Sequence, residues 1–384
     1  MANKQVQSLI KQTFQEMAQA LESGRLGGSP GIALTGLGGE HGEENALRAA
    51  LLASGRGVKV HYIGTLTHPD LICHPASTEE EVHRVMEELL NSGDAAGAVT
   101  MHYPFPIGVA TVGRVVAPAT GREIFLATTT GTSATDRVEG MVRGALAGII
   151  TAKACGIKEP RVGILNIDGA RQTEGILKKL ASAGFPIHFG ASGREGGGSI
   201  LRGNDLLTGS CDVIVTDSLT GNVLVKMMSA FTSGGNYETV GYGYGPGIGE
   251  GYDRLVMIVS RASGAEVVAK AISFAEELTL GDWRTEAQAV YHAAHQAGLE
   301  GLLKEALSRK AAPAEEAVKM PAKEPVTGEI PGIEVMELDD AVQLLWKADL
   351  YAQSGMGCTG PVVMVPETKL EKAVELLKKG GYIN

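Results

Sequence analysis

Two kinds of hydrophobic pattern alternate along this chain. Short, almost wholly apolar runs such as "GIALTG", "VKVHYIG" and "CDVIVTD" are typical of buried strands. Between them, stretches such as "EENALRAALLAS" repeat apolar residues at helical spacing. Alternation of buried strands with helices predicts a mostly parallel sheet that is covered on both faces. The sequence therefore predicts a doubly wound, Rossmann-like α/β fold.

The same patterns divide the chain into four segments. Residues 1–28 carry apolar positions at helical spacing and predict one amphipathic helix, and residues 29–305 form the α/β body. Residues 306–332 lose all periodicity and are rich in Ala, Pro, Lys and Glu, which is typical of a linker. Residues 333–384 show a β-α-β-α pattern. We therefore expect a small C-terminal module that follows a linker.

One helix start is marked by its own residues. Ser77 and Glu80 have the spacing of a capping box, in which two side chains satisfy backbone N–H groups reciprocally. The apolar positions that follow predict a helix that runs to about Asn91.

Composition and charge narrow the class of protein. The formal net charge of −10 gives no basic surface for nucleic acid or anionic membranes. No apolar run approaches the roughly 18 residues of a membrane span, and the first residues lack a signal-peptide pattern. We therefore expect a cytoplasmic protein. The four cysteines lie far apart in a large chain, so we expect reduced thiols rather than disulfides.

Glycine is unusually frequent, with 52 residues, and it gathers in four loops: "TGLGGEHGEEN", "TTTGTSATD", "TDSLTGNV" and "GYGYGPGIGEG". Glycine lets the backbone approach a ligand, and helix N-termini attract phosphate, so each loop fits anion binding. Tight turns are the competing explanation. That explanation is weaker for "TDSLTGNV", where Asp217, Thr220 and Asn222 crowd one strand-to-helix turn. None of the loops has the P-loop or dinucleotide-binding pattern.

The sequence contains no convincing set of metal ligands. His292 and His295 can share one helical face, but no cysteine or carboxylate accompanies them at a metal-ligand spacing, so we expect no metal site. Cys155 and Cys211 lie near the ends of predicted elements and are typical of small buried apolar residues.

Cys358 has a different setting, in "SGMGCTGPVVMV". Gly357 and Gly360 leave the thiol sterically open and free the backbone to present N–H groups to an oxyanion, as acyl-thioester chemistry requires. However, no Lys, Arg or His lies within five residues to lower the pKa of the thiol. A small cysteine in a tight turn explains the same residues, so both interpretations stay open at this point.

Several stretches resemble the PlsX-type phosphate acyltransferases, which make acyl phosphate from acyl carrier thioesters and orthophosphate. They are "RVGILNIDGARQTEG", "LRGNDLLTGSCDVIVTDSLTGNVLVK" and, less closely, "GLGGEHGEENALRAALLA". The resemblance spans about residues 30–280 and implies a PlsX-like fold. It implies proton transfer or positioning by Glu40 and His41. The phosphate-binding residues that it implies are Asp217, Thr220, Gly221, Asn222 and Lys226.

With the linker and the Cys358 module included, the whole chain is similar to the alpha subunits of component C of the glycine/sarcosine/betaine reductase complexes. This resemblance implies that a carboxymethyl group, carried as a selenoether on the selenoprotein component A, becomes an acetyl thioester on Cys358. Orthophosphate then acts as a substrate and releases acetyl phosphate, and no cofactor is expected. The implied partners are that selenoprotein and a ketoacyl-synthase-like beta subunit, within an oligomer.

Two other functions remain open on the sequence. A free-standing phosphate acyltransferase of phospholipid synthesis would turn over a carrier-protein thioester without Cys358. A non-catalytic scaffold for the beta subunit would carry no acetyl adduct. Dependence on an acyl carrier distinguishes the first function, and the mass of the chain after reaction distinguishes the second.

Overall fold

The computed structural model describes most of the chain, which forms two compact units. The first unit comprises residues 1–165 and 173–300, and the second comprises residues 166–172 and 301–384. Most of the predicted N-terminal helix at 1–28 lies outside the described residues. None of the helices within the described residues is long and apolar enough to cross a membrane. The described residues are 31–193, 197–311, 320–333, 337–357 and 360–383, with single positions between Val6 and Ala18.

In the described part of the first unit, twelve strands form one mostly parallel sheet in the order β3-β2-β1-β4-β12-β11-β5-β6-β10-β7-β8, with β9 beside β7. The prediction of a mostly parallel α/β sheet is therefore confirmed. The strands are β1 (Gly31–Thr35), β2 (Val60–Gly64), β3 (Ile72–Pro75), β4 (Ala95–Thr100), β5 (Val109–Val116), β6 (Glu123–Thr132), β7 (Arg161–Leu165), β8 (His188–Phe189), β9 (Ile200–Leu201), β10 (Val213–Val215), β11 (Gly245–Gly249) and β12 (Val256–Ile258).

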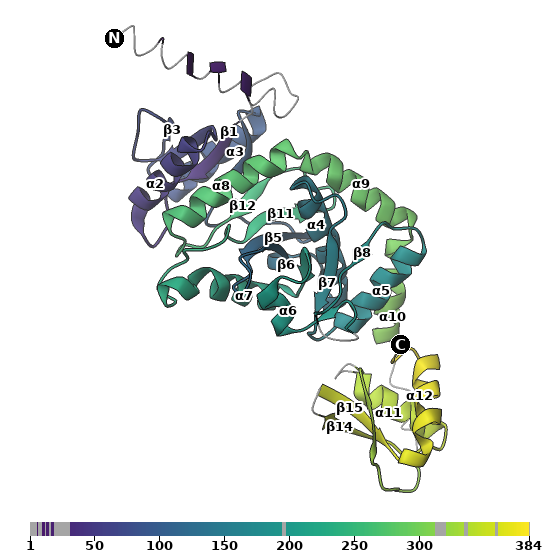
Figure 1. The fold of residues 1–384 in the computed structure, drawn as a ribbon. Helices are drawn as coiled ribbons and strands as arrows, with labels where there is room; N and C mark the ends of the chain where they lie inside the picture. Colours follow the sequence, from purple (N-terminus) through teal and green to yellow (C-terminus); the bar gives the residue numbers. More distant parts are fainter. Residues whose placement is uncertain are drawn as a thin grey trace. The chain divides into compact units, whose positions relative to one another are not determined.

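Helices cover both faces of this sheet, as a doubly wound fold requires. Helices α2, α8, α4 and α9 pack in one layer, while α7 packs against β5 and β6 on the side away from α8 and α9 (Figure 1). Helix α3 packs against β1, β2 and β4. The helices are α2 (Gly42–Gly55), α3 (Glu79–Ser92), α4 (Arg137–Ala154), α5 (Ala170–Ser182), α6 (Gly203–Thr208), α7 (Ser218–Ala230), α8 (Ala265–Leu280), α9 (Trp283–Gln296) and α10 (Leu299–Ala311).

The sheet reverses direction in its middle. Strand β11 is antiparallel to both of its neighbours, β12 and β5, and β5 is antiparallel to β6. Strands β1, β2, β3, β4 and β12 therefore point one way, and β6, β10, β7 and β8 point the other way. Loops that follow β1 or β12 consequently leave the sheet at the edge opposite to the loops that follow β6 or β10.

The glycine cluster "GYGYGPGIGEG" is a strand rather than an anion-binding loop, which corrects the sequence interpretation. Residues Gly245–Gly249 form β11, and all five are buried. Gly245 has a φ of +85°, and a Cβ at this position would overlap the main-chain oxygen of Val112 on β5. The glycines are present because the backbones approach too closely for side chains.

The start of α3 differs from the predicted capping box by one residue. The Thr78 hydroxyl, rather than that of Ser77, accepts a hydrogen bond from the Glu81 amide at 3.2 Å. The Ser77 amide and hydroxyl both donate to the Glu81 carboxylate at 2.8 Å. The predicted end is accurate, because α3 ends at Ser92 and Gly93 follows in the left-handed conformation.

The second unit holds a small sheet with its own core. The antiparallel strands β13 (Gly328–Pro331), β15 (Gly360–Val365) and β14 (Gln353–Gly357) lie in that order, beside α11 (Leu338–Lys347) and α12 (Leu370–Lys379). Leu345, Val363 and Leu377 have no exposed surface. Helix α10 and strand β13 both extend into the stretch predicted as linker. The sequence pattern missed β13 because its pairing with β15 needs no apolar periodicity in β13 itself. Residues 312–319 lie outside the described part.

We expect Gly245→Ala to destabilise the protein by about 3 kcal/mol or more, because the added Cβ meets backbone and the φ is positive. Gly175→Ala is the matched control, since open space surrounds that position on α5, and it should stabilise by roughly 0.5–1 kcal/mol. Denaturant unfolding measures both. Equal stability of the two variants would contradict the close approach of β11 to β5.

Candidate functional site

The first turn of α7 holds the polar residues that the sequence placed in one strand-to-helix turn. Asp217 is the N-cap of α7, and its carboxylate accepts hydrogen bonds from the Thr220 amide at 2.9 Å and the Thr220 hydroxyl at 3.0 Å. Both side chains are partly exposed. The structure thus brings Asp217 and Thr220 into direct contact.

The next two residues fix this turn to β6. The Asn222 amide nitrogen donates to the main-chain oxygen of Thr129 at 3.1 Å. Gly221 is buried, and a Cβ on it would overlap the main-chain oxygen of Thr128. Residues 128–132 of "TTTGTSATD" belong to β6 rather than to a loop, which corrects the sequence interpretation of that stretch. Since β6 and β10 are parallel neighbours, the residues after β6 and "TDSLTGNV" leave the sheet side by side. These two stretches therefore meet at one edge of the sheet.

The charge at this turn limits what it binds. The N-terminus of a helix attracts anions through its free N–H groups. Here the Asp217 carboxylate already takes that place. A phosphate held by Asp217 itself would bring two anions together, so the geometry favours Asp217 as a helix cap. Thr220 and Asn222 keep unused hydrogen-bonding capacity beside it.

Glu40 and His41 lie in the loop between β1 and α2. The Glu40 amide donates to the main-chain oxygen of Arg261 at 2.8 Å, and His41 Nε2 lies 3.3 Å from the main-chain oxygen of Ala262. The His41 ring stands edge-on to Tyr237, with ring centroids 5.4 Å apart. Both candidate side chains are exposed, and the loop after β12 holds the segment that carries them.

Lys226 lies nearer to this second group than to the start of α7. Its ammonium lies 6.0 Å from the centre of the Tyr244 ring. The Tyr244 hydroxyl donates to the Glu238 carboxylate at 3.4 Å. Lys226 lies about two and a half turns beyond the Asp217 cap, so its position gives no support for a contact with a phosphate at that cap.

The structure therefore separates the predicted residues into two groups. The Asp217 cap is at one end of α7. At the other end, the main-chain oxygen of Ser229 accepts hydrogen bonds from the Thr239 and Val240 amides, which hold the segment that includes Tyr237, the neighbour of His41. A helix of this length spans about 20 Å at 1.5 Å per residue. Asn222 and His41 consequently lie at opposite ends of α7, because the strands before their loops run in opposite directions.

Glu238 is a buried acid that the sequence analysis missed. It is 3% exposed, and it accepts a hydrogen bond from the Ser263 hydroxyl at 2.7 Å. Burial raises the pKa of its carboxyl group, partly offset by hydrogen bonds from Ser263 and Ser260 and by the charge of Lys226. The main-chain oxygen of Ser263 in turn accepts from Asn45 of α2 at 3.0 Å. Glu238 thus links the 237–239 segment to the loop that contacts His41.

No local pattern marks Glu238 in the sequence. It stands in "NYETVGYGYG", where an acid among glycine and tyrosine is typical of an exposed loop. Its burial depends on the loop after β12, which follows more than twenty residues later. A buried carboxyl of this kind is visible only in the folded chain.

Two of the four thiols are unsuited to nucleophilic chemistry. Burial raises the pKa of the Cys155 thiol and of the Cys211 thiol, so both remain protonated at neutral pH. Cys211 is buried, as the sequence predicted, whereas Cys155 is only partly buried. Cys73 is partly buried, and its sulfur lies 3.4 Å from the His68 amide.

Cys358 lies outside the described residues, together with Thr359. Strands β14 and β15 pair antiparallel on either side of them, and Gly357 pairs with Gly360. The stretch that precedes the thiol, Gln353–Gly357, is therefore a strand, where the sequence showed only the apolar run of β15.

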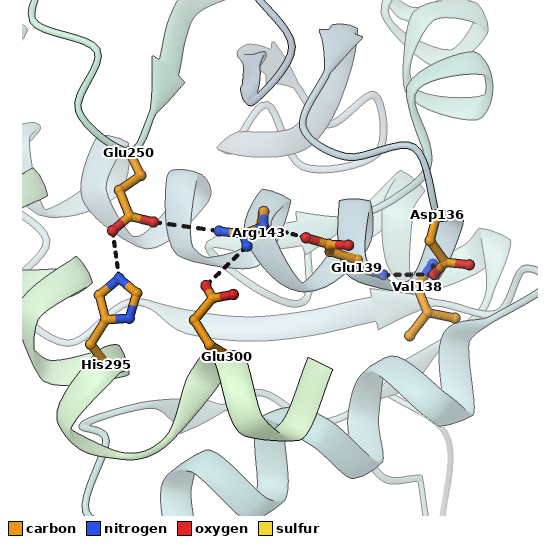
Figure 2. A network of polar contacts seen from close by, with 7 residues as sticks. All are labelled: Asp136, Val138, Glu139, Arg143, Glu250, His295 and Glu300. Atoms are coloured by element: carbon orange, nitrogen blue, oxygen red, sulfur yellow. Dashed lines mark hydrogen bonds and ion pairs between the residues drawn. The ribbon is translucent and has the colours of Figure 1, made fainter. Parts of the chain in front are cut away.

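His295 has carboxylate neighbours that its own helix does not supply. Figure 2 shows Glu250, His295 and Glu300 around Arg143, which also contacts Glu139. His295 Nε2 lies 2.5 Å from Glu250, and Arg143 lies 3.5 Å from Glu250 and 3.0 Å from Glu300. Since the guanidinium already balances both carboxylates, this cluster is an ion-pair network that joins α4, α9 and α10 rather than a candidate metal centre.

The comparisons with known proteins define the class first. Residues 31–364 match the family model FA_synthesis, described as a fatty acid synthesis protein. The chain therefore belongs to this PlsX-like acyltransferase family. Phosphate acyltransferase from Thermus thermophilus is 29% identical over 233 residues, which cover 51% of this chain and 70% of that protein.

The most extensive of these similarities is to a subunit of a reductase complex. The alpha subunit of component C of the glycine/sarcosine/betaine reductase complex from Peptoclostridium acidaminophilum is 54% identical over 382 residues, covering 98% of this chain and 99% of that protein. A branched-chain phosphotransacylase from Enterococcus faecalis V583 is 17% identical with a TM-score of 0.46, over 65% of this chain and 98% of that one. That structural likeness is too loose to inform the site.

The raised pKa of Glu238 predicts a specific pH dependence. A carboxyl group whose pKa is higher in the folded than in the unfolded state stabilises the folded protein at pH values below its ordinary pKa. This contribution to the free energy of unfolding is lost as the pH rises through the pKa of the folded state. Glu238→Gln should therefore gain stability relative to the native chain as pH rises from about 4.5 to 8, as urea unfolding would measure. Ser263→Ala keeps the carboxyl but removes a hydrogen bond that lowers its pKa, so this variant should show a steeper loss of stability with rising pH than the native chain. A parallel pH profile for Glu238→Gln would refute the assignment.

Proposed function

We propose that this chain is an acyltransferase subunit that forms an acyl phosphate from a thioester and orthophosphate. The similarity to a component C alpha subunit over almost the whole chain is the observation that carries this proposal. The relatives named as phosphate acyltransferases support the reaction class, because they match about half of the chain.

The finer proposal concerns the substrate. The two-carbon unit arrives as a carboxymethyl selenoether on a selenoprotein. Its carbon–selenium bond breaks, the methylene carbon is reduced to a methyl group, and the selenium is oxidised and takes up the hydroxyl that the carboxyl group loses. The carboxyl carbon then forms the acetyl thioester with Cys358, and a ketoacyl-synthase-like beta subunit is the expected partner. An oxygen of orthophosphate attacks the acetyl carbon, and the carbon–sulfur bond breaks as the carbon–oxygen bond forms. Acetyl phosphate leaves, and the Cys358 thiolate takes up a proton. No oxidant or reductant enters this step.

The second unit suits a carrier of this kind. It has a hydrophobic core of its own, and β14 ends at Gly357, directly before Cys358. A thiol tethered to the body stays at a high effective concentration near its substrate pocket, provided that the tether reaches. The activating group for the thiol must then come from the body or from a partner, because the neighbouring sequence supplies none.

Orthophosphate is assigned to the first turn of α7. Thr220 and Asn222 offer hydrogen bonds there, Gly221 brings the backbone close to β6, and Asp217 holds the turn. Glu40 and His41 lie about 20 Å away along α7, too far for proton transfer to the same phosphate. Their proposed role is to position another part of the substrate at the opposite edge.

Cys358→Ala should abolish acetyl phosphate formation by the reconstituted complex and leave the fold intact, because no thioester can form. Cys73→Ala is the matched control and should retain activity, since its thiol forms hydrogen bonds to the main chain of His68 and Leu71, away from the proposed site residues. Mass spectrometry should find an acetyl adduct on the native chain and none on Cys358→Ala. Full activity of Cys358→Ala would refute the carrier role, and turnover of an acyl carrier thioester by that variant would favour a free-standing phosphate acyltransferase.

The two ends of α7 give different kinetic expectations. Asn222→Ala should raise the KM for orthophosphate about tenfold, because a hydrogen bond to an anion is lost. Ser218→Ala, an exposed position in the same turn, should leave that KM unchanged. His41→Ala should lower kcat without changing the KM for orthophosphate. If His41→Ala alone raised the KM for orthophosphate, the phosphate site would lie at the other end of α7, and the assignment to its first turn would be wrong.

A further inference from the structure

A pocket lies at the carboxyl ends of β1 and β4, which are parallel neighbours in the sheet. Strand β2 flanks β1 on its other side, so the chain adds β2 on one side of β1 and β4 on the other. Open α/β sheets bind ligands at such a switch point, outside the carboxyl ends of the strands. The pocket encloses about 270 Å³ of space that is open to solvent, and none of the residues that line it has a role in the proposed function.

Four polar side chains line this pocket: Glu79, His83, His102 and Arg261. They come from the start of α3, from the loop after β4 and from the loop after β12. None of these four side chains forms a hydrogen bond or an ion pair with the part of the chain that the structure describes. The fold therefore brings together polar groups from three distant segments and leaves them available to a ligand.

The glycine loop "TGLGGEHG" forms another wall of the pocket. Gly38 has a φ of +93°, and a Cβ at this position would lie 3.5 Å from the Glu79 carboxylate. The main-chain N–H groups of Leu37 and Gly38 donate no hydrogen bond within the described residues. At the strand ends, the Thr35 hydroxyl donates to that of Thr100 at 3.0 Å, and both residues are buried. The pocket thus combines several free donors with one carboxylate.

We propose that this pocket binds a hydrogen phosphate group, either as inorganic phosphate or as a phosphate monoester. A tetrahedral oxyanion accepts several hydrogen bonds, which the Arg261 guanidinium, the two imidazoles and the free N–H groups supply. Its protonated oxygen needs an acceptor, which the Glu79 carboxylate supplies. Sulfate carries no proton at neutral pH, so Glu79 repels sulfate and selects phosphate.

Other small ligands fit these groups less well. A carboxylate ligand carries no proton at neutral pH and would place a second anion against Glu79. A metal ion needs several ligand atoms close together, and the described part of the chain brings three of them within 4.8 Å of one another elsewhere, not in this pocket. The guanidinium of Arg261 adds a positive charge that favours an anion.

This pocket is separate from the first turn of α7. It lies at the opposite edge of the sheet, because β1 and β4 run opposite to β6 and β10. The Glu40 amide donates to the main-chain oxygen of Arg261 at 2.8 Å, so the pocket adjoins the loop of Glu40 and His41. The inference goes beyond the proposed function and does not depend on the phosphate assignment at α7.

Isothermal titration calorimetry with inorganic phosphate tests the proposal in the full-length chain. Asn222→Ala, which weakens the α7 turn, should still bind phosphate. Adding Arg261→Ala should weaken that binding at least about tenfold, because charge-assisted hydrogen bonds are lost. Arg84→Ala is the matched control: it removes the same charge from α3 and should leave the affinity unchanged, since Arg84 pairs with Glu88 at 2.6 Å. Far-UV circular dichroism checks that all variants are folded.

The outcomes separate this pocket from the turn of α7. Equal phosphate affinity of the Arg261→Ala and Arg84→Ala variants, both made in Asn222→Ala, would overturn the proposal. Loss of all phosphate binding in Asn222→Ala alone would also overturn it and would leave the α7 assignment standing. A single bound phosphate that Arg261→Ala removes and Asn222→Ala does not would support this pocket and contradict the α7 assignment.

Selectivity tests the role of Glu79. In Asn222→Ala, phosphate should bind at least about tenfold more tightly than sulfate, and Glu79→Gln should remove this preference, because the amide no longer repels sulfate. Equal binding of sulfate and phosphate with Glu79 present would overturn the proposal. Methyl phosphate identifies the source of the group: tighter binding than inorganic phosphate supports a phosphate monoester, and weaker binding supports free phosphate. Failure of both to bind would overturn the proposal.

Discussion

The reversal of strand direction across β11 and β5 is the constraint on which the rest of the structure depends. A parallel sheet gathers all of its strand-to-helix loops at one edge, where ligands usually bind. Here three successive pairings are antiparallel, β12 with β11, β11 with β5 and β5 with β6, so the loops after β1 and β12 and the loops after β6 and β10 form two separate groups. The buried glycines of β11 make this junction possible, since Gly245 leaves room for the Val112 carbonyl.

Helix α7 connects the two groups of loops. Its first turn, capped by Asp217 and held to β6 through Asn222, is the proposed phosphate site. Its last turn leads to the segment that buries Glu238 and contacts His41 through Tyr237. Its outer face carries the exposed apolar side chains of Leu219, Val223 and Met227.

The division into two units matches the chemistry that is proposed. A transfer reaction that begins on one protein and ends with release of a small phosphate ester benefits from a carrier that is separate from the pocket. The second unit has a complete core and an antiparallel sheet of its own. Strand β13 lies within the stretch predicted as linker, so this core begins earlier in the sequence than apolar periodicity indicates.

The sequence by itself determined the α/β class, most helices and strands, and the Asp217–Asn222 turn, because periodicity and turn chemistry report local geometry. Only the tertiary structure decided that "GYGYGPGIGEG" is a strand, that Glu238 is buried, and that His41 and Asn222 lie at opposite ends of α7. Each of these depends on which distant strands become neighbours and in which direction. Strand pairing is a long-range contact, and the pattern within one strand does not encode its partner.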